Sequence, residues 1–215
     1  MLQKLLYKHF CALDSPFVVQ IGSHDGRTDD PLYPFLSNDP AWSALLVEPL
    51  PFYVNQLYPL YSDRKNVRIV QAAVGSQCGS APFYWVDPSA RSTLHDLPSW
   101  FAQLGSLDST HIRKHFGASI GPHILTCRVA TLTLLQLLTD YNVTDFHILH
   151  VDAEGSDWII LQQLRYLPRI PEFILFEHIH LNPSTLKTAV SYLEQFYALQ
   201  FVDKDCFGIS HQSHS

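Results

Sequence analysis

The sequence has 215 residues, of which 47% are hydrophobic and 16% are charged, so we expect one domain with a full hydrophobic core. The net charge is −6 and no basic run is present, which argues against nucleic acid and anionic membranes as partners. No apolar stretch is long enough to span a bilayer, and the first ten residues are amphipathic rather than signal-like. The four cysteines are scattered without paired spacing, which favours free thiols. We therefore expect a cytoplasmic protein.

Apolar runs alternate with helical patterns along the first third of the chain. Such alternation predicts an α/β fold with a mostly parallel sheet and crossover helices. Helices are expected over 2–12 and 31–38, and strands over 17–21, 44–48 and 67–70. Residues 49–51 are expected to end the second strand, and Phe52, Leu57, Leu60 and Tyr61 mark the next expected helix. A further strand, as one half of a hairpin, is expected over 81–87.

Residues 88–122 interrupt this alternation with several prolines, serines and glycines and a short helix expected over 108–116. An insert of this length in a compact domain is more often functional than idle, so we interpret it as a substrate lid. The alternative is a surface excursion that packs elsewhere. Three apolar side chains of the insert would cover the site or meet a partner: Trp100, Phe101 and Leu104.

The alternation resumes after the insert and continues to the end of the chain. Strands are expected over 124–129, 146–152 and 172–177, with helices over 131–141, from about 156, and over 184–197. Residues 199–209 are expected to supply a closing antiparallel strand or pair. No repeat or domain boundary is evident, so we predict a single domain over 1–215.

The stretch from Val18 to Gly26 is the most informative part of the sequence. A buried strand runs into a turn that contains Gly22 and Gly26, and Glu48 ends the next strand. Glycines in this turn let a ligand approach the backbone, and an acid after the second strand takes ribose hydroxyls. The pattern predicts a site for a nucleotide-type ligand.

The details of the turn distinguish between two such ligands. In a dinucleotide motif of the form G-x-G-x-x-G, His24 and Arg27 would replace the second and third glycines. Asp25, Asp29 and Asp30 would repel a pyrophosphate at the helix start, although Asp29 or Asp30 also suits a helix cap. An acidic loop suits the sulfonium cation of S-adenosylmethionine (SAM). We therefore favour SAM over NAD, with an NAD-dependent oxidoreductase as the alternative.

Polar side chains follow every expected strand of the sheet. Because the carboxyl ends of parallel strands meet at one edge, these side chains are expected to form a common pocket. They include Gln20, Glu48, Gln71, His150, Asp152, Glu154, Glu177, His178 and His180.

Six short motifs occur in the order found in the FkbM-type SAM-dependent methyltransferases, and the sequence resembles this family over residues 16–180. The motifs are Gln-Ile-Gly-Ser-His-Asp-Gly (20–26), Val-Glu-Pro-x-Pro (47–51), Ala-Ala-Val-Gly (72–75), Thr-Leu-x-Leu-Leu (131–135), Val-Asp-Ala-Glu-Gly-x-Asp (151–157) and Phe-Glu-His (176–178). The resemblance implies a Rossmann-like class I methyltransferase fold with a seven-stranded sheet. It also implies methyl transfer from SAM, mostly to hydroxyl oxygens of sugars or secondary metabolites. Gln20 stands where many relatives carry an acid, and His150 where a lysine is common.

The predicted cofactor site combines the turn, the strand ends and the acid of the second strand. Glu48 is expected to accept hydrogen bonds from both ribose hydroxyls. Gln71 and Ala72 are expected beside the adenine, and Asp152 beside the amino-acid part and the methyl group. The full predicted set is Gln20, Gly22, Ser23, Asp25, Gly26, Glu48, Gln71, Ala72 and Asp152.

Transfer to a hydroxyl oxygen requires removal of a proton, and three residues are predicted to be catalytic: His178, Asp152 and Glu154. His178 is the first choice as base because an imidazole titrates near neutral pH. Its structural alternative is a hydrogen bond to a carbonyl at a strand end, and Glu154 and Asp157 alternatively cap a helix.

No metal site is predicted, because no ligand spacing is diagnostic. The alternative is Mg²⁺ or Mn²⁺ held by Asp152, Glu154, Glu177, His178 and His180. The expected partner is a small-molecule acceptor such as a saccharide. A non-catalytic nucleotide-binding or scaffold domain is the remaining alternative.

Overall fold

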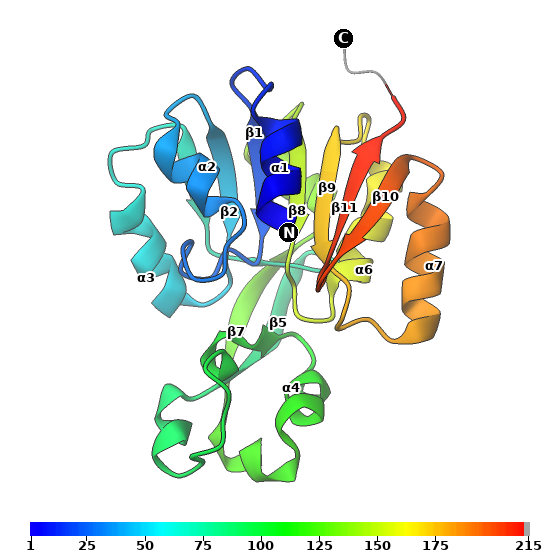
Figure 1. The fold of residues 1–215 in the computed structure, drawn as a ribbon. Coiled ribbons are helices and arrows are strands. Elements are labelled where there is room, and N and C mark those ends of the chain that lie inside the picture. Colours follow the sequence, from blue (N-terminus) through cyan, green and yellow to red (C-terminus); the bar gives the residue numbers. More distant parts are fainter. Residues whose placement is uncertain (213–215) are drawn as a thin grey trace.

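A seven-stranded sheet forms the centre of the molecule, of which the computed structural model describes residues 1–212 (Figure 1). The strand order is β10-β11-β9-β8-β1-β2-β3. β11 is antiparallel to both of its neighbours, and all other pairs are parallel, which confirms the predicted topology. The strands are β1 (Phe17–Ile21), β2 (Ser43–Val47), β3 (Val67–Val70), β8 (Ile148–Val151), β9 (Phe173–Glu177), β10 (Tyr197–Val202) and β11 (Asp205–Ser210).

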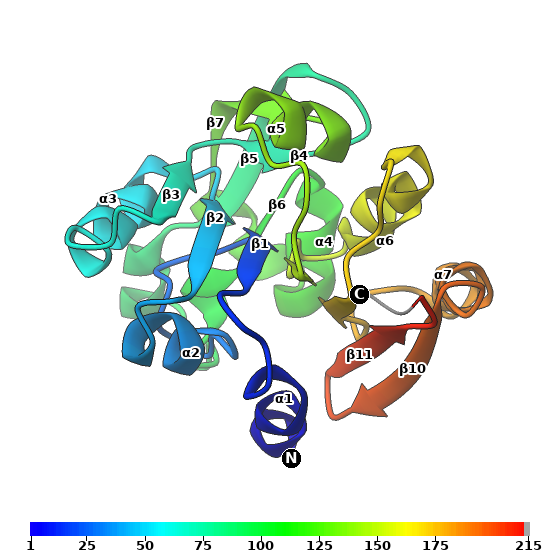
Figure 2. The ribbon, with the colours of Figure 1, turned by 90° about the horizontal axis from the view of Figure 1, so that it is seen from above.

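Helices cover both faces of this sheet, which explains why its central strands are nearly continuous apolar runs. Alternate residues of one strand enter different cores: Val18 packs with residues of α1, α2 and α3, whereas Val19 packs with residues of α5, α6 and α7. Figure 2 shows these two groups of helices on opposite sides of the sheet. The first three helices are α1 (Leu2–Phe10), α2 (Tyr33–Asn38) and α3 (Pro51–Leu60). The other three are α5 (Leu134–Asp140), α6 (Asp157–Leu161) and α7 (Pro183–Leu193). No helix within residues 1–212 is both long and apolar enough to cross a membrane.

A second sheet, in the order β4-β7-β5-β6, lies beyond one end of the first (Figure 1). Its strands are β4 (Ala73–Val74), β5 (Gly79–Val86), β6 (Gly105–Ser106) and β7 (Ile124–Leu132). β5 and β7 form an antiparallel pair from Gly79 opposite Thr131 to Val86 opposite Ile124. The strand expected over 81–87 is therefore half of a hairpin. The strand expected over 124–129 extends to Leu132 and joins this second sheet instead of the parallel one.

The insert connects the two strands of this hairpin. Short 3-10 turns at 88–92, 101–103 and 118–123 flank α4 (Ser109–Phe116) along the chain. Asp108 caps the start of α4, because its side chain accepts a hydrogen bond from the Thr110 N–H. The insert has its own small core, which includes Phe101, Leu104 and Ile112. Its packing is therefore independent of the main sheet cores.

Candidate functional site

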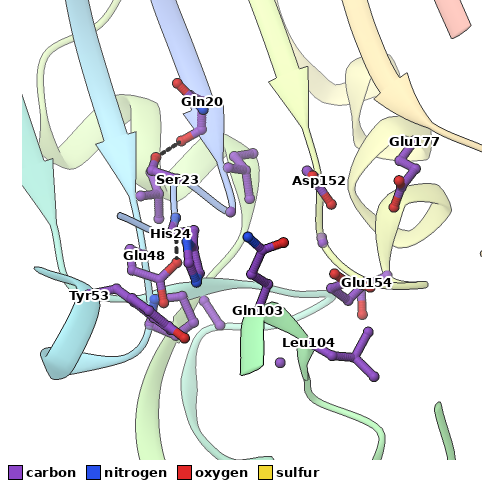
Figure 3. A pocket seen from close by; sticks show the side chains of 18 of the residues that line it. Gln20, Ser23, His24, Glu48, Tyr53, Gln103, Leu104, Asp152, Glu154 and Glu177 are labelled. Atoms are coloured by element: carbon purple, nitrogen blue, oxygen red, sulfur yellow. Dashed lines mark hydrogen bonds between the residues drawn. The ribbon is translucent and has the colours of Figure 1, made fainter. Parts of the chain in front are cut away.

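A cavity of about 430 Å³ lies at the carboxyl ends of β1, β2, β8 and β9, between the main sheet and the insert (Figure 3). This is the usual ligand position in an open α/β sheet, and the volume is typical of a small-molecule site. Its lining includes Gln20, Gly22, Ser23, His24, Asp30, Glu48, Leu50, Tyr53, Ala72, Ala73, Trp100, Gln103, Leu104, His115, His150, Asp152, Glu154, Glu177, His180 and Lys204.

The turn after β1 is held tightly against the end of β8. Gly22 has φ +83°, and a Cβ atom at this position would lie 1.8 Å from the carbonyl oxygen of Asp152. The N–H groups of Gly22 and Ser23 both donate to the Val47 carbonyl, at 3.0 and 3.1 Å. Only glycine fits at this position, and the close contact between Gly22 and Asp152 holds the β1 turn against the end of β8.

The carboxylate of Glu48 is held at the end of β2 by two backbone donors. The N–H of His24 donates to Oε2 at 3.0 Å, and the N–H of Leu50 donates to Oε1 at 2.9 Å. A carboxylate has about four acceptor positions, so two remain for a ligand. Burial raises the pKa of Glu48 to about 7, although both N–H groups oppose this shift.

An aromatic pair lies beside Glu48 and connects the sheet to the insert. The rings of His24 and Tyr53 have centroids 3.7 Å apart, and the Tyr53 hydroxyl donates to the Ala102 carbonyl at 2.7 Å (Figure 3). Sequence reasoning missed Tyr53, because its role depends on where the insert docks. Ala72 and Ala73 supply an apolar surface in the same cavity.

Gln20 brings an unsatisfied acceptor to the pocket. Its Nε2 donates to Asp30 Oδ2 at 3.0 Å, while its buried Oε1 has no hydrogen-bond partner among the described residues. The Gln20 side chain therefore presents an acceptor backed by the carboxylate of Asp30. This arrangement suits a donor such as an ammonium group, since a buried acceptor without a partner is costly.

Acidic side chains from two further strand ends form the opposite side of the pocket (Figure 3). His180 Nε2 lies 2.7 Å from Glu177 Oε2 and 3.3 Å from Glu154 Oε2. Lys204 Nζ lies 2.9 Å from Glu177 Oε1. Burial raises the pKa of Glu154 to about 7, and burial followed by the charge of Glu177 raises the pKa of Asp152 well above its usual value. Both carboxyl groups can therefore hold a proton near neutral pH.

Two histidines of the insert join this acidic group. His111 and His115 lie one turn apart on α4, and His111 Nε2 is 3.4 Å from Glu154 Oε2. Burial lowers the pKa of His111 to about 4 and also lowers that of His115, which favours uncharged imidazoles. Two overlapping groups have ligand atoms close enough for a metal ion: His111, His115 and His180, and Glu154, Glu177 and His180. The His-x-x-x-His spacing on an expected helix was the available sequence signal for the first group.

His150 is buried under the pocket as an uncharged side chain. Burial, followed by the charge of Lys204, lowers its pKa to about 4. Lys204 reaches the same cavity from the turn between β10 and β11. The cation in this region thus comes from Lys204, a residue that the sequence reasoning did not single out.

The structure brings most of the predicted cofactor residues into the cavity. Three do not line it. Asp25 caps its own turn by accepting from the N–H groups of Arg27 and Thr28, at 2.9 and 2.8 Å. Gly26 faces α3, where a Cβ atom would lie 2.5 Å from Leu57 Cδ2, and Gln71 is exposed. The residues that do line the cavity are Gln20, Gly22, Ser23, Glu48, Ala72 and Asp152.

Of the predicted catalytic residues, Asp152 and Glu154 line the cavity, whereas His178 does not. The His178 ring packs on Phe201 with centroids 5.0 Å apart, and it lines a separate hollow along α7. The chain turns after β9, so His180 rather than His178 faces the carboxylates. Asp157 accepts from the N–H groups of Ala153 and Gly155, which is the capping role considered as its alternative.

Comparisons with known proteins agree with this geometry. The family model described as the methyltransferase FkbM domain matches residues 20–200. No curated protein matches the sequence. The METTL16 MTase domain has a TM-score of 0.52 at 8% identity, covering 98% of this chain and 66% of that chain. A chain of the fibrillarin/Nop5p complex has a TM-score of 0.50 at 11% identity, covering 98% and 79%. At these identities the likeness shows the fold alone, and it confirms the class I methyltransferase fold.

Proposed function

Since this chain belongs to the FkbM methyltransferase domain family and is a SAM-dependent methyltransferase, we propose that it methylates a hydroxyl oxygen of a sugar or another small metabolite. One observation carries the proposal. Carboxylates that can take a proton, those of Asp152 and Glu154, lie across the cavity from Glu48, on the side of the sheet that faces the insert (Figure 3).

The residues on the Glu48 side fit the methyl donor. Glu48 has two acceptor positions left for the ribose hydroxyls, and Gln20 Oε1 can accept from the ammonium group, with Asp30 behind it. Ala72 and Ala73 offer an apolar surface to the adenine. When bound, SAM supplies a methyl group on a positively charged sulfur. The carboxylates of this site favour that charge.

Glu154 is the group that we assign as proton acceptor. It lines the cavity, and its Oε2 atom lies 3.3 Å from His180 and 3.4 Å from His111. With SAM bound, the acceptor oxygen would form its bond to the methyl carbon while the carbon–sulfur bond breaks and S-adenosylhomocysteine leaves, and the hydroxyl proton would pass to the Glu154 carboxylate. Asp152, at the end of β8, orients the reacting groups from the other side. The assignment replaces His178, whose ring lies in a different hollow.

The surroundings of the cavity favour a small and uncharged acceptor. Trp100, Gln103 and Leu104 of the insert form part of its wall, which is the position required of a lid. The lining carries several carboxylates and the chain has a net charge of −6, so a phosphate polymer would be repelled. Sugars and similar polyols avoid this repulsion and present hydroxyl groups to Glu154.

A methyl-transfer assay tests the proposal directly. The purified protein is incubated with isotope-labelled SAM and a panel of sugars and small hydroxylated metabolites, and products are identified by mass spectrometry. We expect labelled O-methyl products, a loss of turnover of at least about 100-fold in Glu154→Gln, and unchanged SAM affinity in that variant. Gln71→Ala, at an exposed position outside the cavity, is the control. Full turnover by Glu154→Gln would remove Glu154 from the mechanism, and label on nitrogen alone would refute O-methylation.

A further inference from the structure

Three histidine rings from two distant segments converge at the edge of the cavity. His111 and His115 come from α4 of the insert, and His180 follows β9 of the main sheet. The ring centroids lie 4.8 Å apart for His111 and His115, 5.1 Å for His111 and His180, and 4.9 Å for His115 and His180. The ring planes cross at 62°, 83° and 75°, so none of the three pairs is stacked.

We propose that His111, His115 and His180 bind a divalent transition-metal ion such as Zn²⁺, beside the carboxylate of Glu154. One nitrogen of each ring lies within 4.8 Å of the others. Zinc–nitrogen bonds of about 2.0–2.1 Å place tetrahedral ligand nitrogens about 3.4 Å apart. Binding an ion would therefore require the three rings to move closer together by side-chain rotation.

The backbone around the cluster is shaped to hold it. His111 and His115 are four residues apart, so both project from one face of α4. Gly155 has φ +88°, and a Cβ atom there would lie 2.9 Å from His111 Nδ1, so only glycine leaves room for this ring. The Ser106 hydroxyl of the insert donates to the Glu154 carbonyl at 3.1 Å and holds the adjoining loop.

The carboxylates around the rings complete the environment of a metal centre. Glu154 Oε2 lies 3.4 Å from His111 Nε2 and 3.3 Å from His180 Nε2, and Glu177 lies 2.7 Å from His180. Such carboxylates offset the charge of the ion, and a carboxylate that accepts from the second ring nitrogen also orients a ligating imidazole. Imidazole-rich sites select zinc, copper or nickel over magnesium, which prefers oxygen ligands. Of the oxygen-rich set considered from the sequence, Glu154, Glu177 and His180 have ligand atoms close together, whereas His178 lines a separate hollow.

If the protein methylates a hydroxyl group, as proposed above, an ion at this position would take part in the methyl transfer. Three protein ligands leave a fourth position, and His115 and His180 line the same cavity as Asp152 and Glu154. An acceptor hydroxyl bound there would lose its proton more easily, with the proton passing to Glu154. The ion would also fix α4 of the insert to the main sheet, which closes the cavity.

Zinc binding by the intact protein tests the proposal. The metal-free protein is titrated with Zn²⁺ against a chromogenic chelator, and bound metal is measured by elemental mass spectrometry. We expect one zinc per chain at micromolar or lower concentration, and affinity at least about tenfold lower in His115→Ala. His115 is exposed, so this substitution leaves the fold intact, and His180→Ala provides an independent second variant. His95→Ala is the matched control, because His95 is an exposed histidine of the same insert outside the cluster.

The outcomes separate this site from the methyl-donor site. No zinc binding in the micromolar range, or equal binding by wild type, His115→Ala and His180→Ala, would overturn the metal site. SAM binding measured by calorimetry on the same samples does not require the ion. A protein that binds SAM but not zinc would refute only the metal site, whereas a protein that binds zinc but not SAM would refute the proposed function.

Discussion

Replacing Glu48 with glutamine tests the assignment of the donor site with little change in shape. Glu48 is buried and accepts one backbone N–H on each carboxylate oxygen, from His24 at 3.0 Å and from Leu50 at 2.9 Å. In the proposed donor site, the free acceptor positions of both oxygens receive the ribose hydroxyls. In Glu48→Gln one oxygen becomes an NH₂ group, which cannot accept, and the negative charge is lost.

The expected loss follows from these contacts. A hydrogen bond to a charged acceptor contributes roughly 1.5–3 kcal/mol, compared with about 0.5–1.5 kcal/mol for a neutral one. In Glu48→Gln both ribose hydroxyls lose a charged acceptor, and one of them loses its acceptor altogether. The substitution should therefore reduce the binding free energy of SAM by about 2–3 kcal/mol. At about 1.4 kcal/mol per factor of ten, SAM should bind roughly 30- to 150-fold more weakly.

Isothermal titration calorimetry at pH 8 measures this effect, because that pH lies above the Glu48 pKa of about 7. Gln71→Ala is the control: the sequence placed Gln71 beside the adenine, but it is exposed and outside the cavity. We expect this control to bind SAM like the wild type. A Kd for Glu48→Gln within about threefold of the wild-type value would refute the ribose assignment.

Three further predictions follow from the same geometry. Gly22→Ala should lower the free energy of unfolding by at least about 3 kcal/mol, because the new Cβ meets the Asp152 carbonyl at 1.8 Å with φ at +83°. Gly75→Ala, whose Cβ would meet its nearest neighbour at 3.7 Å, should change stability by less than about 1 kcal/mol in the same urea titration. The affinity for SAM should fall as the pH drops below about 7, by up to about tenfold per pH unit, because protonation of Glu48 removes the charge that receives the hydroxyls. A flat calorimetric profile between pH 6 and pH 8 in the wild type would contradict this reasoning, and Glu48→Gln should show a weaker pH dependence than the wild type. Tyr53→Phe removes the 2.7 Å hydrogen bond to Ala102, so the insert should lose about 1 kcal/mol of local stability. Hydrogen exchange over residues 88–122 measures it, and unchanged exchange there would show that Tyr53 does not anchor the insert.

The main sheet was predictable from the sequence because its central strands are buried on both faces. β1, β2, β8 and β9 are apolar runs of four or five residues followed by polar side chains, and this pattern depends little on tertiary detail. β7 is different. Most of its residues are partly or fully exposed, and the apolar stretch from Ile124 to Val129 contains no information about which sheet it joins. β7 pairs with β5 across the whole insert, and such a pairing between distant segments cannot be read from the local sequence pattern.

The half of the site that lies at strand ends was also predictable. Glu48 and Asp152 reach the cavity because parallel strands end at one edge of a sheet. The other half depends on tertiary packing. His115 enters through the docking of α4, and Lys204 through the turn between β10 and β11. The choice between His178 and His180 depends on the turn after β9, where a shift of two residues moves a ring from the cavity to a different hollow.

The central claim is that the cavity headed by Glu48 binds SAM. Calorimetric titration of the purified protein with SAM, S-adenosylhomocysteine and NAD tests this claim most directly. Glu48 and the unpartnered Gln20 acceptor predict micromolar binding of the first two compounds, while Asp30 and the acidic lining predict no binding of the pyrophosphate of NAD. Binding of NAD alone, or binding of none of the three, would contradict the account.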